Sequence, residues 1–137
     1  MTPSNADDKH DRNRLYEVVD RNVIESLIEL GGDDDPHLLE ELIDLFLTDG
    51  DVRVAEIKEA VETRDLNRIA AATHTLKSAS ANLGVLHFSE FCCEIETHAR
   101  LGESSAAFEL ARETGERYAV VRQALQTLRA QRGMSAA

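Results

Sequence analysis

A histidine and a lysine lie one helical turn apart in the segment THTLKSASANLGV, residues 73–85. A neutral imidazole nitrogen is a nucleophile, and a free histidine, with a pKa of about 6.5, is largely neutral near pH 7. Lys77, three residues after His74, would present a compact positive charge beside the ring. A phosphoryl group carries up to about two negative charges. The pair could therefore hold a phosphoryl group on His74, with Lys77 stabilising its charge.

The residues around His74 are small. On a helical wheel of about 100° per residue, His74 lies almost opposite a predicted buried stripe. That stripe contains Ile69, Thr73, Leu76, Ser80 and Leu83. A solvated helix face normally carries long charged side chains, whereas small ones would let a flat protein surface approach the imidazole. We therefore predict a docking face made of Asn67, Ala70, Ala71, Ser78 and Ala81.

A simpler interpretation remains open on spacing alone. An exposed histidine is usually an ordinary surface residue, and a run of alanines often reflects helix propensity or a helix–helix contact. The other four histidines lack both a lysine three residues later and a face of small residues, so no role is predicted for them: His10, His37, His87 and His98.

Helices are the elements predicted to position this segment. Apolar residues recur at helical spacing, and the chain has only two prolines and no tryptophan. The fold class is predicted to be all-α, an antiparallel four-helix bundle with an additional short N-terminal helix. Residues 15–132 would form the bundle domain, between flexible tails at 1–14 and 133–137. The expected helices span residues 20–30, 36–63, 65–84, 86–101 and 104–132.

Local signals set the expected helix ends. Gly31 and Gly32 should stop the first helix, and Asp35 should cap the second with Pro36 in its first turn. Asp65 should cap the third helix. Gly50 lies inside the second helix, where it costs about 1 kcal/mol relative to alanine and could mark a local bend. The apolar phase continues through it, with Leu45 and Val52 among the residues of the apolar face.

The charge of the chain limits its function. The 137 residues have a formal net charge of −11, which argues against a nucleic-acid partner because such binding needs a basic surface. Residues 25–65 contain 14 acidic and three basic residues, and so account for this excess. The acidic run is either a solvated face or a patch that steers a partner. No apolar run could cross a membrane and the N-terminus has no secretory pattern, so a cytoplasmic protein without membrane insertion is expected.

The two cysteines, Cys92 and Cys93, are neighbours on a predicted helix. Their side chains would point about 100° apart, so they cannot hold one metal ion together. No metal-ligand spacing links them to His87 or His98. We predict that both are buried as small hydrophobic residues and that the chain has no metal site.

The same segment resembles histidine-containing phosphotransfer (HPt) domains. Their motif is roughly H-x-L-K-G-x-(S/A)-x-x-(L/I/V)-G, and the chain has HTLKSASANLG at residues 74–84. One fixed position differs, because Ser78 stands where the family most often has glycine. Serine is also small, so docking should survive. The matching positions are His74, Leu76, Lys77, Ser80, Leu83 and Gly84.

The resemblance implies a relay in a two-component phosphorelay. His74 would accept a phosphoryl group from the phospho-aspartate of one receiver domain and pass it to the aspartate of another response regulator. The expected partners are receiver domains and a hybrid sensor histidine kinase. The chain would have no kinase activity, which agrees with its lack of a glycine-rich phosphate loop. It would need no cofactor, because magnesium belongs to the receiver domain.

The resemblance also implies a polar residue beside the histidine, from the following helix. Family spacing puts Glu96 there, where it could orient the ring, although it could equally be an ordinary exposed acid. Two other functions stay open. The chain could be a docking module without phosphotransfer, or a hydrolase or metalloenzyme, which would need paired inward carboxylates with Glu-x-x-His spacing.

Overall fold

The computed structural model describes residues 14–135, and all regular structure in that range is helical. A short helical segment at residues 14–18 precedes the labelled helices. None of the described helices is long and apolar enough to span a membrane. The labelled helices are α2 (Arg21–Gly31), α3 (Leu38–Thr63), α4 (Leu66–Asn82), α5 (Leu86–Arg100), α6 (Ser104–Ala111) and α7 (Thr114–Ser135).

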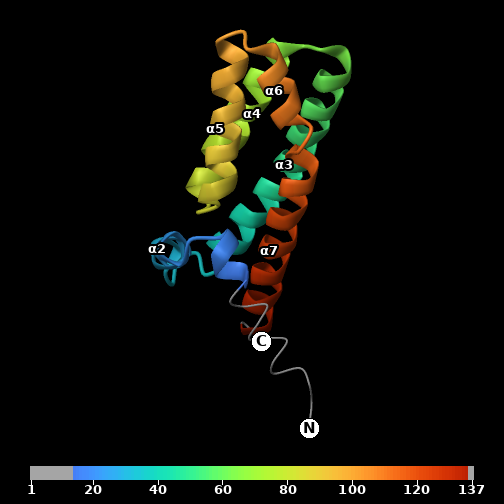
Figure 1. Ribbon diagram of the computed structural model, residues 1–137. Coiled ribbons are helices and arrows are strands. Elements are labelled where there is room, and N and C mark those ends of the chain that lie inside the picture. The colour runs from blue at the N-terminus through green and yellow to red at the C-terminus, as the bar shows by residue number, and fades with distance from the viewer. Residues whose placement is uncertain (1–13, 136–137) are drawn as a thin grey trace.

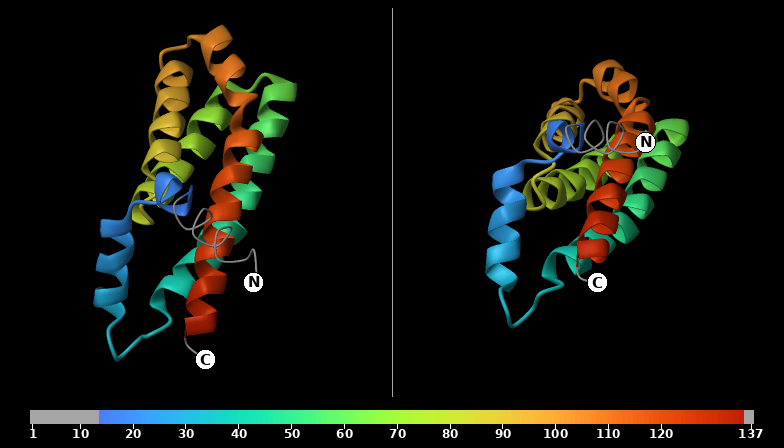
Figure 2. Two further views of the ribbon diagram at one scale, coloured as in Figure 1. Left: turned by 60° about the horizontal axis from the view of Figure 1, so that its bottom comes forward. Right: turned by 90° about the horizontal axis from the view of Figure 1, so that it is seen from below.

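Four of these helices, α3, α4, α5 and α7, run side by side as a bundle (Figure 1). Short α6 closes one end, between α5 and α7, whereas α2 lies outside the bundle near the other end (Figures 1 and 2). The start of α2 is tied to the α4–α5 turn, since the Asp20 amide donates to the Gly84 carbonyl at 2.8 Å. The predicted all-α bundle with an extra N-terminal helix is confirmed.

Of the two predicted N-caps, Asp65 is present and Asp35 is not, and Asp20 is a further cap that was not predicted. Asp20 accepts a hydrogen bond from the Val23 amide, and Asp65 accepts one from the Arg68 amide, so both cap helices as short polar residues do. The prediction for Asp35 and Pro36 was wrong, because α3 begins at Leu38. The Asp35 amide donates instead to the Gly31 carbonyl, in the turn that leads the chain out of α2.

The predicted fifth helix is in fact two helices. A turn at Arg112 and Glu113 separates α6 from α7, which lets α6 pack back against α5. The buried positions keep helical spacing across this turn, so the sequence pattern does not reveal it: Ala107, Phe108, Ala111, Thr114, Tyr118, Val121, Leu125 and Leu128.

The predicted tail boundaries also need correction. Helix α7 continues to Ser135, so the C-terminal tail does not begin at residue 133. At the other end, Arg14 is already helical. Residues 1–13 and 136–137, which complete the two predicted tails, lie outside the described part of the chain.

Several apolar residues lie on the surface rather than in the core. Leu45 and Val52, which we expected on the buried face of α3, are 66% and 48% exposed. Of the two cysteines, Cys92 is buried as predicted, but Cys93 is exposed. Adjacent residues on a helix diverge by about 100°, so only one of the two can face the core.

Gly50 allows a close contact between α3 and α7. A Cβ atom at this position would lie 2.7 Å from Tyr118 Oη and 3.0 Å from its Cε1. The tyrosine is buried, and its hydroxyl donates to Asp51 Oδ1 at 2.7 Å, so the ring is held in place. Gly50 therefore makes room for Tyr118.

We expect Gly50→Ala to destabilise the protein despite its better helix propensity. The gain of about 1 kcal/mol from propensity is outweighed by overpacking against a fixed ring, which costs about 1–3 kcal/mol. Urea unfolding should show a net loss of about 1 kcal/mol. In the control, Gly115→Ala, the new Cβ meets no atom within 4 Å. That variant should be at least as stable as the wild type, and a stabilised Gly50→Ala would contradict the packing argument.

Candidate functional site

Helix α4 presents His74 to solvent because its opposite face is in the core. The side chain of His74 is 55% exposed. The predicted stripe is confirmed, since each of its members is buried: Ile69, Thr73, Leu76, Ser80 and Leu83. The rotation of α4 is thus set by its apolar face, and His74 points outward as a result.

Glu96 of α5 lies against His74 and is nearly enclosed, with 8% of its side chain exposed. Three donors converge on it. Glu96 Oε2 lies 2.9 Å from His74 Nδ1 and accepts from Arg100 Nε at 2.8 Å, while Oε1 accepts from Lys77 Nζ at 2.7 Å. The alternative that Glu96 is an ordinary exposed acid is therefore excluded.

These contacts decide the charge of Glu96. Burial alone would raise the pKa of a carboxyl group, but the hydrogen bonds from Lys77, Arg100 and His74 outweigh it and lower the pKa of Glu96 to about 2. In turn, the hydrogen bond to Glu96 raises the pKa of Lys77. At neutral pH, a carboxylate and an ammonium group therefore face each other beside the histidine.

The ionised carboxylate also fixes the tautomer of His74. A carboxylate can only accept hydrogen bonds, so the 2.9 Å contact requires a proton on Nδ1. In the neutral ring, the lone pair must then lie on Nε2. His74 therefore combines an exposed ring with a nucleophilic nitrogen on the side away from Glu96.

A hydrogen bond between backbone and side chain holds the two helices of the site together. Ser89 of α5 donates its hydroxyl to the backbone carbonyl of Lys77 at 2.8 Å. Both the serine and the carboxylate of Glu96 are buried, so α5 contacts α4 at two levels around Lys77. The backbone of Lys77 is thus held in place, and its amine is hydrogen-bonded to Glu96 Oε1.

Four of the five residues predicted to form the docking face are exposed in the structure. Asn67, Ala71, Ser78 and Ala81 are exposed on α4, on the same side of the helix as His74. Ala70 is only 5% exposed and belongs to the hydrophobic core, so its assignment to the surface was wrong. Its direction on the wheel lies between the two faces, where the packing of neighbouring helices decides burial.

Two features of the site were missed at the sequence level. Arg100 was not considered, although it lies four residues after Glu96, a spacing that favours a salt bridge on a helix. The second feature is an apolar groove of about 360 Å³ between α3 and α4. It lies beside the docking face and is lined by Leu42, Leu45, Phe46, Asp49, Ala79, Asn82 and Leu83.

A second histidine–glutamate pair lies at the N-terminal end of α3. Glu40 is buried, lies 2.8 Å from His37 Nδ1 and accepts from Arg132 Nε at 3.0 Å. Burial opposes ionisation of Glu40, but its hydrogen bonds with His37 and Arg132 lower its pKa overall. No lysine is part of this second His–Glu pair in the described structure.

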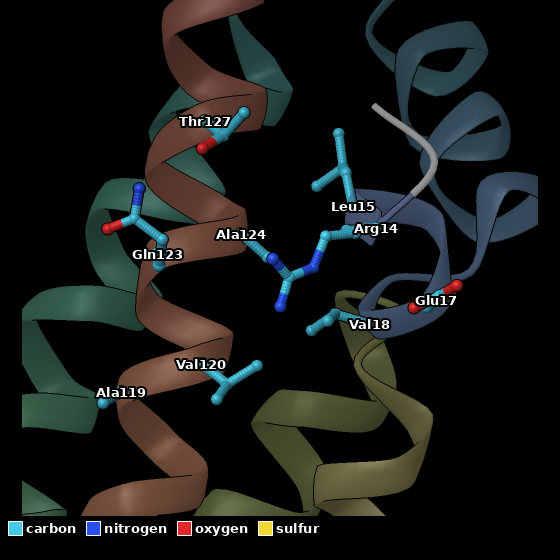
Figure 3. Close-up of a pocket in the computed structure, with 9 residues that line it drawn as sticks. All are labelled: Arg14, Leu15, Glu17, Val18, Ala119, Val120, Gln123, Ala124 and Thr127. Atoms are coloured by element: carbon cyan, nitrogen blue, oxygen red, sulfur yellow. The ribbon is translucent and has the colours of Figure 1, made fainter. Parts of the chain in front are cut away.

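A further cavity, of about 460 Å³, lies between residues 14–18 and α7 (Figure 3). The side chain of Arg14 extends into it, towards Ala124 on α7 (Figure 3). None of its lining residues belongs to the His74 site. Among the residues that the structure describes, no group of three or more histidine, cysteine or acidic side chains could hold a metal ion.

Known proteins are similar to this chain in sequence and in fold. The chain is 28% identical to histidine-containing phosphotransfer protein B from Pseudomonas aeruginosa PAO1, whose crystal structure matches with a TM-score of 0.73 over 83% of this chain and 96% of that one. The maize phosphotransfer protein ZmHP2 matches with a TM-score of 0.76 at 19% identity, over 94% and 98% of the two chains, which shows a common fold.

A curated relative is the multistep phosphorelay regulator 1 of Schizosaccharomyces pombe, 24% identical over 97 residues. The match covers 71% of this chain but only about a third, 33%, of that protein. The sequence model of the Hpt domain matches residues 41–131. The chain therefore belongs to the Hpt domain family, whose members are intermediates of phosphorelays, and a histidine phosphotransfer role is supported.

The lowered pKa of Glu96 predicts how acid weakens the fold. A carboxyl group with a depressed folded-state pKa contributes stability that is complete above its ordinary pKa of 4.5 and is lost as the pH falls towards about 2. Glu96→Gln should abolish this contribution. Urea unfolding at about pH 3 and about pH 6 should therefore show a smaller pH effect in the variant than in the wild type. The control Glu94→Gln removes an exposed charge of α5 and should behave as the wild type.

Proposed function

We propose that His74 is the phosphoryl acceptor of this Hpt domain and reacts through Nε2. The observation that carries the proposal is the contact of Nδ1 with a buried, ionised Glu96, which leaves the lone pair on the exposed side of the ring. Nε2 would attack the phosphorus of a phospho-aspartate, and the P–O bond to the carboxylate would break as the P–N bond forms. The aspartate would leave as a free carboxylate.

Lys77 and Glu96 have different parts in this proposal. Lys77 stabilises the phosphoryl group, because its ammonium lies on the same side of α4 and is 30% exposed. Glu96 holds the ring in the tautomer that can react, and Arg100 keeps Glu96 in position. The exposed small residues Asn67, Ala71, Ser78 and Ala81 let the partner approach the ring.

Hpt domains act in phosphorelays with receiver domains and kinases. For this chain, we propose response regulator receiver domains as donor and acceptor, and a hybrid sensor histidine kinase as the source of the phosphoryl group. The chain itself would have no kinase activity and no cofactor, with magnesium bound by the receiver. A cytoplasmic location follows from such partners and is part of the same proposal.

The competing proposal is a docking module that binds receivers without taking up phosphate. Its specific support is the apolar groove beside the docking face, which could bind a partner whatever happens at His74. The proposal of a hydrolase or metalloenzyme has no comparable support, because the Glu96 carboxylate is engaged by three donors of its own chain.

Labelling separates phosphotransfer from docking alone. With a radiolabelled phosphorylated receiver domain, the wild-type chain should acquire an acid-labile, base-stable label, and His74→Gln should acquire none. His37→Gln is a matched control, because His37 also contacts a buried glutamate but has no lysine in its pair. That variant should be labelled as the wild type. Receiver binding without any label on the wild type would support the docking module.

The docking surface can be tested by receiver titration. Ser78→Leu would place a bulky side chain one turn from His74, and Leu45→Asp would put a charge in the apolar groove. Each should weaken receiver binding at least about tenfold, since steric clashes and buried unpaired charges cost more than about 1.4 kcal/mol. Val120→Asp changes an exposed apolar residue, 58% accessible, on α7, a helix that contributes neither to the His74 site nor to the groove, and should not affect binding. Unchanged affinity in both test variants would place the receiver on another face.

A further inference from the structure

The residue that orients His74 is a carboxylate, and this choice has a chemical consequence. A neutral amide at the same place could orient the ring too, but it offers both an acceptor oxygen and donor N–H groups. It could therefore hydrogen-bond to Nδ1 with or without a proton. A carboxylate only accepts, so the 2.9 Å contact is favourable only while Nδ1 carries a proton.

The proton on Nδ1 matters most when the phosphoryl group leaves. In onward transfer, a carboxylate oxygen of the receiving aspartate attacks phosphorus and the P–Nε2 bond breaks, with its electron pair going to Nε2. If Nδ1 is protonated, the group that leaves is a neutral imidazole. If Nδ1 has lost its proton, an imidazolate anion must leave, and that is a much poorer leaving group.

Phosphorylation leaves the protonated ring with a positive charge, because Nε2 then forms a bond with its former lone pair. The charged groups joined to this ring by contacts are Glu96 of α5 and, through Glu96, Arg100 of α5 and Lys77 of α4. The Cys93 thiol lies near Lys77. No charged side chain of α3, α6 or α7 forms an ion pair with these groups in the described structure. Among the residues that the structure describes, Glu96 is the one carboxylate that pairs with His74 and can balance the charge of the ring.

The remaining contacts allow Glu96 to keep this role after phosphorylation. Lys77 Nζ binds Oε1, whereas His74 and Arg100 both bind Oε2. Lys77 can therefore turn from Oε1 to the phosphoryl group without breaking either contact at Oε2. Arg100 would still hold the carboxylate against Nδ1.

From this geometry we infer that Glu96 keeps the proton on Nδ1 of phosphorylated His74, so that the phosphohistidine stays ready to transfer above neutral pH. The inference rests on the proposed function, because it concerns the phosphorylated form of His74. Glu96 acts here as a positioning residue: it touches the ring but not the phosphorus. Its effect should appear as a change in the pH dependence of transfer, not only in its rate.

The test compares onward transfer from the phosphorylated wild type, Glu96→Gln and Glu94→Gln to one receiver domain between about pH 6 and about pH 8.5. Use of the same receiver throughout cancels its own pH dependence. Each rate is expressed relative to the rate of the same protein near pH 6, which separates an overall loss of rate in Glu96→Gln from a change in its pH dependence. By about pH 8.5, Glu96→Gln should be slower than the wild type by at least about tenfold, since a group above its titration loses about tenfold in protonated fraction per pH unit.

The control Glu94→Gln removes the same formal charge from an exposed position of α5 and should keep the wild-type profile. Parallel profiles for the wild type and Glu96→Gln, or equal slowing at every pH, would overturn the inference. Absence of label on wild-type His74 would be seen before any transfer is measured, and would reject the proposed function instead.

A second measurement needs no variant. In the ¹⁵N-labelled, phosphorylated wild-type protein, the ring nitrogen shifts report whether Nδ1 carries a proton. The proton should persist to about pH 8.5. Its loss between about pH 6 and about pH 7.5 would overturn the inference even if Glu96→Gln failed to fold.

Discussion

The site depends on one buried carboxylate shared by two helices. Taking Glu96 out of water is costly unless its oxygens are satisfied, and here three donors satisfy them. Two of the donors come from α4 and one comes from α5. Because the buried Glu96 carboxylate needs all three hydrogen bonds, it fixes the position of α4 relative to α5 at this point. His74 is oriented and Lys77 is held nearby as consequences of the same requirement.

The bundle supports this arrangement by fixing α4 and α5 elsewhere. The apolar stripe of α4 determines which side of the helix faces water, and the Ser89 hydroxyl binds the backbone at Lys77. On the other side of the bundle, α3 and α7 are held in register by Asp44 with Arg129 and by Asp51 with Arg122. On each helix the two paired residues are seven positions apart, which is about two helical turns, so they lie on the same face of that helix. The site thus lies on one helix pair of a bundle whose other pair is locked separately.

Most of the fold could be predicted from periodicity and caps, but contacts between distant residues could not. The α6–α7 turn escaped notice because buried residues such as Phe108, Ala111 and Tyr118 keep a helical period across it. The role of Gly50 depends on Tyr118, 68 positions away, which no local pattern reveals. At the site, His74 and Lys77 were visible as neighbours on one helix. The position of Glu96 beside His74 was predicted only from the family resemblance, and the contact of Arg100 with Glu96 was seen only in the structure.

The acidic segment illustrates why composition alone left two interpretations open. Six of its 14 acidic residues form ion pairs with arginines, so part of the charge is compensated within the chain: Glu40 with Arg132, Asp44 with Arg129, Asp49 and Glu56 with Arg53, Asp51 with Arg122 and Glu59 with Arg68.

Three of those arginines come from α7, so the acidity of α3 and the basic residues of α7 compensate each other across the bundle. Beside His74 the positive charges outnumber the negative ones, because Lys77 and Arg100 both pair with the single carboxylate of Glu96. A protein that is acidic overall therefore presents a local excess of positive charge at the histidine. An arriving phosphoryl group meets that local charge at short range, where it outweighs the screened net charge of the rest of the chain.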